Sequence, residues 1–280
     1  MKDAKEQQDE DIHLAARKGD LKEIQRILST DPSTLNANGW MGAKPLYYAA
    51  ESGSLECVQF LLNNGAQVNE PSNESKTTAI FGASTAEIAK LLLENGAELN
   101  VISQRGRVPL DYAIQYGHED VVKVLIAHGA NVNYDKGPNF FSTMIQWAIE
   151  PARNSRNNEA LAESDNSHRV RERIVELLLK AGADPNQTNV YKQTAINKAC
   201  RFGQLGIVEL LLKYGANPNL RDISGDTAFD EAKEHTEILK VLEPFRKDIP
   251  LPPRVQCTPE ELVQRLLKAD ADNCDSYSIH

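Results

Sequence analysis

The sequence predicts an all-α solenoid in which about seven similar helix-turn-helix units stack on one another. Three observations carry this prediction. A short phrase, Gly-Ala-x-x-Asn, recurs along the chain; an amphipathic run rich in leucine precedes each copy; and a shorter apolar phrase follows roughly ten residues later.

The recurring phrase sets the length of the unit. Its five copies begin at Gly65, Gly96, Gly129, Gly182 and Gly215. The steps between these glycines are 31, 33, 53 and 33 residues. A fixed period of this size is typical of a repeat array, in which each unit is one supersecondary element.

The run before each phrase predicts a helix. In residues 58–62 and 208–212, apolar side chains at spacings of three and four form one wide face. The glycine then ends the helix, because a left-handed residue is favoured just past a helix terminus. The asparagine is interpreted as a turn residue that bonds its own backbone.

The phrase that follows predicts a second, shorter helix. Residues 45–50, 109–113 and 194–199 combine small and apolar side chains, and they start with Pro or Thr. Thr is a good N-cap and Pro suits the first helical turn. One such pair of helices is too small to bury its own apolar face, so we expect neighbouring units to cover it.

A turn followed by two antiparallel helices, opened by a TPLHxA-like phrase and closed by LLLxxGAxxN, resembles the ankyrin repeat. The resemblance covers about residues 10–243 and implies an all-α ankyrin-repeat solenoid with short β-hairpin-like loops between units. The first unit, residues 12–38, looks like an N-terminal cap, and the last, residues 227–242, looks like a C-terminal cap.

Several segments of the chain do not follow the repeat pattern. A polar segment, residues 1–9, precedes the array, and the third unit lacks two residues within 78–87. An insertion near residues 150–171 is either a binding loop or a tolerated mobile loop. Beyond the array we expect a Pro-rich linker, residues 244–257, and then a short amphipathic helix with a flexible tail, residues 258–280.

The resemblance implies a function as a protein-binding scaffold or adaptor. In ankyrin arrays the hairpin tips and the exposed side of each first helix line a concave groove. Aromatic and Arg side chains dominate binding hot spots. The partner-binding residues that we predict on this basis are Trp40, Met41, Arg105, Arg107, Tyr116, Tyr191, Arg201 and Phe202.

Composition narrows the partners and the location. The net charge of −9 argues against duplex nucleic acid or an anionic membrane, since both require clustered Lys and Arg. The N-terminus does not resemble a secretory signal, and no apolar stretch is long enough to span a bilayer. We therefore expect a cytoplasmic monomer whose partner is another protein.

We expect neither catalysis nor a cofactor. The chain contains no phosphate-binding glycine loop and no GxSxG phrase, and its histidines do not cluster at metal-ligand spacing. The resemblance implies a structural hydrogen bond for His13, while His118 and His128 are interpreted as surface residues. Cys57 and Cys200 are expected to be buried, inert thiols.

Two alternatives and one modification stay open. The chain could be a bacterial effector that acts in a host cytosol, as ankyrin proteins of intracellular bacteria do. It could also be an enzyme whose site lies at the insertion of the fifth unit. The resemblance further implies a possible substrate of an asparaginyl hydroxylase at Asn100, where Leu92 and Glu98 fit that enzyme's preference.

Overall fold

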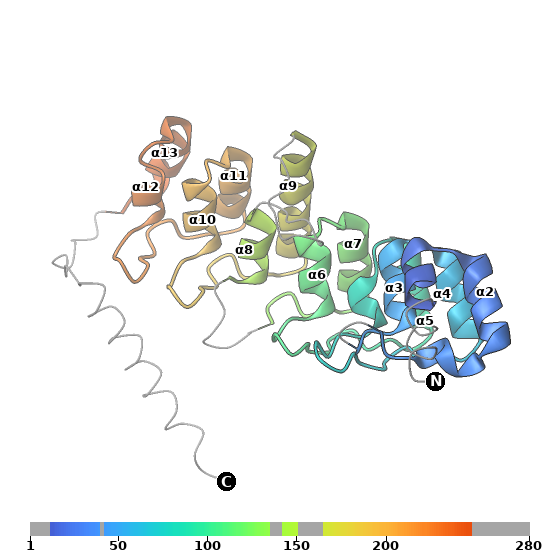
Figure 1. The fold of residues 1–280 in the computed structure, drawn as a ribbon. Helices are drawn as coiled ribbons and strands as arrows, with labels where there is room; N and C mark the ends of the chain where they lie inside the picture. The colour runs from blue at the N-terminus through green and yellow to red at the C-terminus, as the bar shows by residue number, and fades with distance from the viewer. Residues whose placement is uncertain (1–11, 40–41, 135–141, 151–164, 248–280) are drawn as a thin grey trace, which may run out of the picture. The chain divides into compact units, whose positions relative to one another are not determined.

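The computed structural model describes residues 12–39, 42–134, 142–150 and 165–247. All regular secondary structure in these ranges is helical, which confirms the all-α prediction. The chain divides into two compact units, Met1–Lys136 with Ser142–Pro185 and Gly137–Phe141 with Asn186–His280. Each unit is a stack of helix pairs, and seven pairs can be followed through the described residues (Figure 1).

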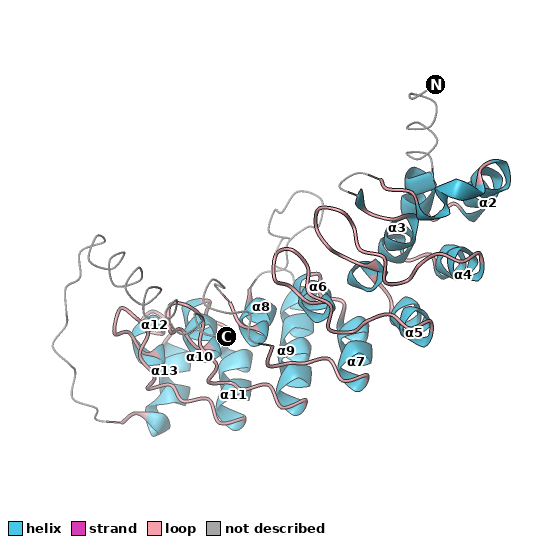
Figure 2. Ribbon diagram, turned by 90° about the horizontal axis from the view of Figure 1, so that it is seen from below, coloured by secondary structure: helices cyan, strands magenta, loops and turns pink. Residues whose placement is uncertain are grey.

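The first compact unit holds five helix pairs. Their first members are residues 12–18, α3 (Pro45–Ser52), the 3₁₀ turn η3 (Ala79–Gly82), α6 (Pro109–Gln115) and α8 (Met144–Ile149). Their second members are α2 (Leu21–Thr30), α4 (Leu55–Asn63), α5 (Ala86–Glu94), α7 (Glu119–Ala127) and α9 (Asp165–Lys180). A further 3₁₀ turn, η1, covers Pro32–Asn36. In this unit α3, α6 and α8 form one row and α4, α5, α7 and α9 the other (Figure 2).

The second compact unit holds two helix pairs. They are α10 (Ala195–Arg201) with α11 (Leu205–Lys213), and α12 (Ala228–Glu231) with α13 (Thr236–Leu242). A 3₁₀ turn, η4 (Glu243–Phe245), follows directly. Here too the first helices α10 and α12 pack together, and so do the second helices α11 and α13.

The local signals read from the sequence set the helix ends. Pro45 and Pro109 occupy the first helical turns of α3 and α6. The glycines of the recurring phrase adopt the left-handed backbone expected of them, for example φ 91° at Gly65 and 93° at Gly129. Nothing lies within 4 Å of a Cβ built at either glycine, so it is the positive φ that favours glycine there.

The leucine-rich second helices supply the core. Val58 and Leu61 of α4 are fully buried, and so are their counterparts in α11, Val208 and Leu211. Burial of one such side chain contributes roughly 1.5–3 kcal/mol. Because these positions face the neighbouring helices, the free energy of folding is shared between successive repeats.

The asparagines of the recurring phrase do not bond their own backbone, so that interpretation was wrong. Asn69 Nδ2 donates to the carbonyl oxygen of Gly96 at 2.8 Å, and its Oδ1 accepts from Glu98 N at 2.8 Å. Asn133 makes the same pair of bonds to the next copy of the phrase in the first unit, and Asn186 does so in the second. Each of these side chains therefore joins one repeat to the next.

Part of the inserted stretch is helical. Helix α9 begins at Asp165, so the residues 165–171 that we assigned to the inserted loop belong to an extended second helix. The remainder, residues 151–164, lies outside the described part of the chain, as do the Pro-rich segment from 248 onward and the predicted C-terminal helix. Among the described helices, none is long and apolar enough to cross a bilayer.

Candidate protein-binding site

Aromatic side chains accumulate on the first helices of the first compact unit. In the second to fifth repeats they occupy one or both of two neighbouring positions of the TPLHxA-like phrase, and one more follows at the end of α6. We call the resulting set the aromatic face: Tyr47, Tyr48, Phe81, Tyr112, Tyr116 and Trp147, with Arg17 and Arg107 packed against the rings.

The rings of this face pack edge to face. The centroids of Tyr47 and Tyr48 are 5.6 Å apart at 86°, and those of Phe81 and Tyr112 are 5.1 Å apart at 84°. Tyr112 also contacts Tyr116 at 6.2 Å. T-shaped aromatic pairs of this kind contribute about 0.5–1.5 kcal/mol beyond the area that they bury. The face is therefore a rigid surface, with Tyr48 and Phe81 buried and the other rings partly exposed.

A glycine in the third repeat allows that repeat to approach the second closely. The third repeat, which the sequence showed to be short, has only the 3₁₀ turn η3 in place of a first helix. At its end, a Cβ on Gly82 would lie 2.7 Å from the carbonyl oxygen of Tyr47, so no side chain fills this position. Burial raises the pKa of Tyr47, and Glu51, Tyr112 and Tyr116 raise it further, so these groups lie within electrostatic range of one another.

Two arginine guanidinium groups lie over aromatic rings. The guanidinium carbon of Arg107 is 4.5 Å from the ring centroid of Trp147 and 5.9 Å from that of Tyr112. Its Nη1 donates to Gln115 Oε1 at 2.5 Å. Arg17 lies over Tyr48 at 4.4 Å. Cation–π contacts of this geometry stabilise by roughly 0.5–1 kcal/mol at exposed sites, and they fix the direction of the guanidinium N–H groups.

The predicted partner-binding residues of the first unit belong to this region. Arg105 is exposed in the hairpin loop before α6, whereas Arg107 is half-buried against the rings. Tyr116 is half-buried at the end of α6, where burial raises its pKa. Trp40 and Met41 lie outside the described residues.

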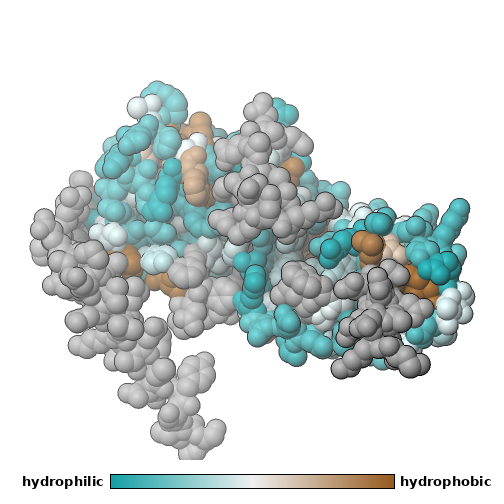
Figure 3. Space-filling view, viewed as in Figure 1, coloured by the Kyte–Doolittle hydropathy of each residue, from teal (hydrophilic) through white to brown (hydrophobic). Residues whose placement is uncertain are grey.

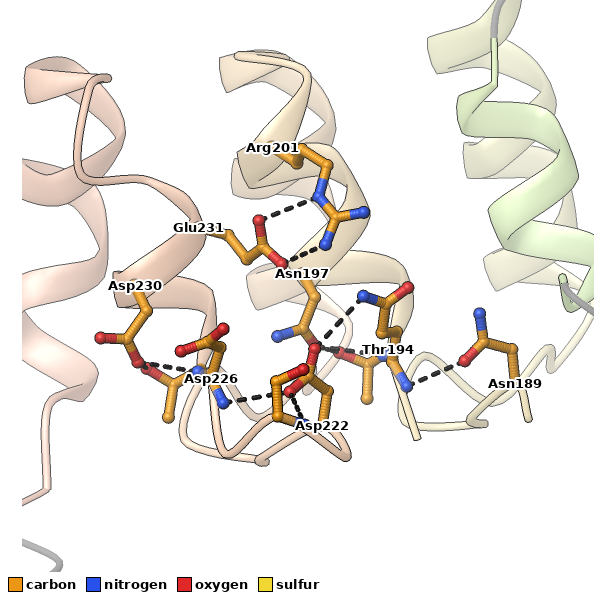
Figure 4. Close-up of polar contacts among 11 residues, drawn as sticks. Asn189, Thr194, Asn197, Arg201, Asp222, Asp226, Asp230 and Glu231 are labelled. Atoms are coloured by element: carbon orange, nitrogen blue, oxygen red, sulfur yellow. Dashed lines mark hydrogen bonds and ion pairs between the residues drawn. The ribbon is translucent and has the colours of Figure 1, made fainter. Parts of the chain in front are cut away.

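In the second unit, the predicted residues are held by polar contacts between repeats. Arg201 at the end of α10 forms a two-pronged ion pair with Glu231 of α12, with Nε 2.9 Å from Oε2 (Figure 4). Phe202, the next residue, is exposed. The carbonyl oxygen of Tyr191 accepts from the backbone N of Ile223 in the following hairpin loop at 3.0 Å. Arg201 thus has a structural role that the sequence did not reveal.

Polar residues stand where the family phrase has histidine, and they cap their own helices. The Oδ1 of Asn197 accepts from Thr194 N at 3.0 Å, and the Oδ2 of Asp230 accepts from Thr227 N at 2.8 Å. Figure 4 shows both pairs below the Arg201–Glu231 contact. In the first unit Asp111 caps α6 in the same way, at 2.9 Å from Val108 N. Each of these bonds satisfies the free backbone N–H group at the start of its helix.

A buried lysine is the residue that the sequence reasoning missed most clearly. Lys44 occupies the N-cap position of α3, where four other repeats have Thr. Its Nζ donates to Glu70 Oε1 at 2.6 Å, to Asn38 Oδ1 at 2.8 Å and to the carbonyl oxygen of Asn36 at 3.2 Å. It ties the hairpin loop of the first repeat to that of the second. Only the substitution of Lys for Thr in the repeat phrase could have indicated it.

The surface carries few exposed apolar side chains. Those of the described residues are Leu14, Leu55, Ile102, Phe202 and Phe245. The face shown in Figure 3 is mainly hydrophilic, with small and separate hydrophobic patches. A surface of this kind favours recognition through partly exposed aromatic and charged groups over a single large apolar contact.

Among the described residues, no group of three or more His, Cys, Asp or Glu side chains could hold a metal ion. His13 Nε2 lies 3.1 Å from the carbonyl oxygen of Ala37, as the family resemblance implied. His118 is half-buried, not a surface residue as expected, and burial lowers its pKa. Cys57 and Cys200 are fully buried, and burial raises the pKa of Cys200 to about 12.

Asn100, the predicted hydroxylation site, is exposed. Its Oδ1 accepts one long hydrogen bond, 3.3 Å from Asn131 N. The corresponding Asn69 makes two bonds of 2.8 Å. Asn100 is therefore the more loosely held of these two asparagines, and its modification stays a prediction.

Comparisons with known proteins agree with this architecture. A family model described as ankyrin repeats (3 copies) matches residues 3–72 and 69–136. A second model, described as ankyrin repeats (many copies), matches residues 174–232. Ankyrin repeat, SAM and basic leucine zipper domain-containing protein 1 of Dasypus novemcinctus is 32% identical over 133 residues, which is 45% of this chain and 27% of that protein. The chain thus matches about a quarter of that relative's length.

A bacterial relative matches over a longer stretch. Putative ankyrin repeat protein YahD of Escherichia coli (strain K12) is 26% identical over 191 residues, covering 68% of this chain and 88% of that protein. Among solved structures, the human ASB11 ankyrin repeat domain superposes with a TM-score of 0.69 and 23% identity over 85% of this chain and 98% of that domain. Sequence models, relatives and fold agree, and the chain belongs to the ankyrin-repeat family.

Proposed function

We propose that this chain is a non-catalytic scaffold or adaptor that binds a partner protein through the aromatic face and the hairpin loops beside it. Ankyrin repeat domains are in general protein–protein interaction modules, and they are typically not enzymes. The observation that carries the proposal is the set of partly exposed Tyr, Trp and Arg side chains on consecutive first helices of one compact unit.

The composition of this face supports the proposal. Tyr, Trp and Arg are the residues most enriched in binding hot spots, because they offer large contact areas and directed hydrogen bonds at low entropic cost. The rings of the face already contact one another, so little side-chain freedom is lost when a partner binds. The exposed Phe202 and the loop residue Tyr191 are the equivalent candidates in the second unit.

The chain offers a matched pair of residues for the test. Tyr116 follows α6 and precedes Gly117, while Tyr214 follows α11 and precedes Gly215. Both rings are half-buried, but Tyr116 ends a first helix and Tyr214 ends a second helix. Affinity capture from cytosol should compare the wild type with Tyr116→Ala and Tyr214→Ala, after thermal melts have shown that both variants fold.

We expect Tyr116→Ala to lose a protein that the wild type and Tyr214→Ala both capture. Purified protein should then bind that partner at least about 10-fold more weakly when Tyr116 is replaced. Equal capture by all three proteins would contradict the assignment of the aromatic face. The second helices or the segments outside the described residues would then be the binding surface.

A further inference from the structure

The described arginines differ in whether they form an ion pair. Four of them pair with a glutamate: Arg26 with Glu23, Arg173 with Glu119, Arg201 with Glu231 and Arg246 with Glu243. Among the arginines without an ion pair to a carboxylate in the described part of the chain are Arg17, Arg105 and Arg107. These three belong to the aromatic face or to the hairpin loop beside it.

The hairpin loops add a third cation near Arg105 and Arg107. The carbonyl oxygen of Ser75 accepts from Gln104 N at 2.8 Å, which places the loop 72–77 beside the loop 103–107. Lys76 is exposed at the tip of the first loop, with φ 55°. We call Lys76, Arg105 and Arg107 the basic edge. Glu74 is the only carboxylate within these two loops.

The basic edge adjoins the exposed tyrosines. Arg105 and Arg107 both lower the pKa of Tyr112 and of Tyr116, although burial raises these values more strongly, so both cations act directly on the two rings. Two acids oppose these cations: Glu51 of α3 raises the pKa of Tyr116, and Asp111 raises that of Tyr112.

The unused donors of Arg107 point to the chemistry of the ligand. A guanidinium carries five N–H donors in one plane, and the side chain of Arg107 uses one of them, toward Gln115. The contact with Trp147 and the hydrogen bond to Gln115 hold the guanidinium at this position. A carboxylate is the planar acceptor that such a fork binds through two parallel hydrogen bonds.

We propose that the partner segment is an acidic peptide whose carboxylates bind the basic edge while an adjacent apolar side chain packs on Tyr116. The inference rests on the proposed function, since it names the class of partner for the same face. An excess of cations at this place is notable in a chain of net charge −9, because a chain that is acidic on average disfavours an acidic ligand elsewhere. The basic edge thereby also fixes where such a ligand binds.

The test uses the full chain and two displayed peptide libraries of equal design. One library carries Asp or Glu at alternate positions and the other carries Asn or Gln there. Enriched peptides are then measured by fluorescence anisotropy against the wild type, Arg105→Glu and Tyr116→Ala. Arg169→Glu is the matched control, because Arg169 is also exposed and without a carboxylate partner among the described residues, yet it lies on the second helix α9.

We expect the acidic library to be enriched and Arg105→Glu to weaken the selected peptides at least about 10-fold, with Arg169→Glu changing the affinity less than about 2-fold. Because Arg105 is exposed, this variant should fold normally. Equal losses in the two variants would overturn the inference, since overall charge would then explain the effect.

The remaining outcomes separate this inference from the proposed function. Enrichment of neutral peptides that bind Arg105→Glu normally but lose affinity for Tyr116→Ala would overturn the acidic partner and leave the aromatic face as the binding site. Selected peptides that are insensitive to both substitutions would contradict both. Tighter binding of the same peptides when phosphoserine replaces their Asp residues would overturn the choice of carboxylate as the ligand group.

Discussion

The ammonium group of Lys44 and the carboxylate of Glu70 form an ion pair of 2.6 Å between two successive hairpin loops, with the lysine side chain only 9% exposed. Lys44 also donates to Asn38 and to the backbone carbonyl of Asn36, so one side chain holds the end of the first repeat against the second. The N-terminal cap therefore depends on a polar anchor as well as on its apolar core.

Replacement of this lysine should be costly. We expect Lys44→Met to destabilise the protein by about 2 kcal/mol, because it removes three hydrogen bonds and leaves the carboxylate of Glu70 half-buried without its cation. The free energy of urea unfolding measures the effect. The control is Lys240→Met, which breaks an exposed pair with Glu237 and should cost less than about 0.5 kcal/mol. Similar losses in the two variants would show that the anchor is unimportant.

The asparagines that join the repeats should differ in their contribution. Asn69→Ala removes two bonds of 2.8 Å to the next repeat, so we expect a loss of about 1–2 kcal/mol. Asn100→Ala removes one bond of 3.3 Å, and the loss should be no more than about 0.5 kcal/mol. Chemical unfolding of the two variants side by side makes the comparison. A larger loss of unfolding free energy for Asn100→Ala than for Asn69→Ala would contradict the expectation drawn from the hydrogen-bond distances.

The ion pair between Arg201 and Glu231 should couple two repeats of the second unit. The Glu231 side chain is 13% exposed and that of Arg201 is 48% exposed, and the contact is two-pronged. A double-mutant cycle with Arg201→Gln and Glu231→Gln should give a coupling energy of about 1 kcal/mol. The exposed pair of Arg26 and Glu23, measured in the same way, should give roughly 0.3 kcal/mol. A coupling energy near zero for the first pair would rule out its structural role.

The short third repeat should tolerate no side chain at Gly82. A Cβ there would lie 2.7 Å from a backbone atom of Tyr47, so we expect Gly82→Ala to cost about 1–3 kcal/mol. Gly206, exposed within α11, offers a control of opposite sign, because Ala at a helical glycine stabilises by roughly 0.5–1 kcal/mol. Differential scanning calorimetry measures the melting temperature of both variants and so shows whether each substitution destabilises or stabilises the protein. An unchanged melting temperature for Gly82→Ala would contradict the close approach of the two repeats.

The parts of the fold that follow from local chemistry were predictable from the sequence. The glycine after each leucine-rich run, the Pro or Thr at each helix start and the periodic apolar positions act within a few residues, and the structure has them as expected. The confirmed burial of Cys57 and Cys200 follows from the same periodicity. Local signals of this kind are consistent with the global fold in repeat proteins.

The parts that were missed depend on residues about one repeat apart. Asn69 bonds residues 27 and 29 positions later, and Lys44 meets Glu70 across 26 positions. The close approach of the third repeat to the second depends on the absence of a side chain at Gly82. A single sequence shows which residues recur, but it gives no distance between side chains of neighbouring units.

Hydrogen exchange of the full chain, alone and with the protein that the wild type captures, tests the binding account most directly. The account predicts slower exchange in the loop 103–107 and in the first helices α3 and α6, with little change in the second helices α4 and α7. Protection confined to α4, α5 and α7, with the loop 103–107 unaffected, would contradict it and place the partner on the opposite row of helices.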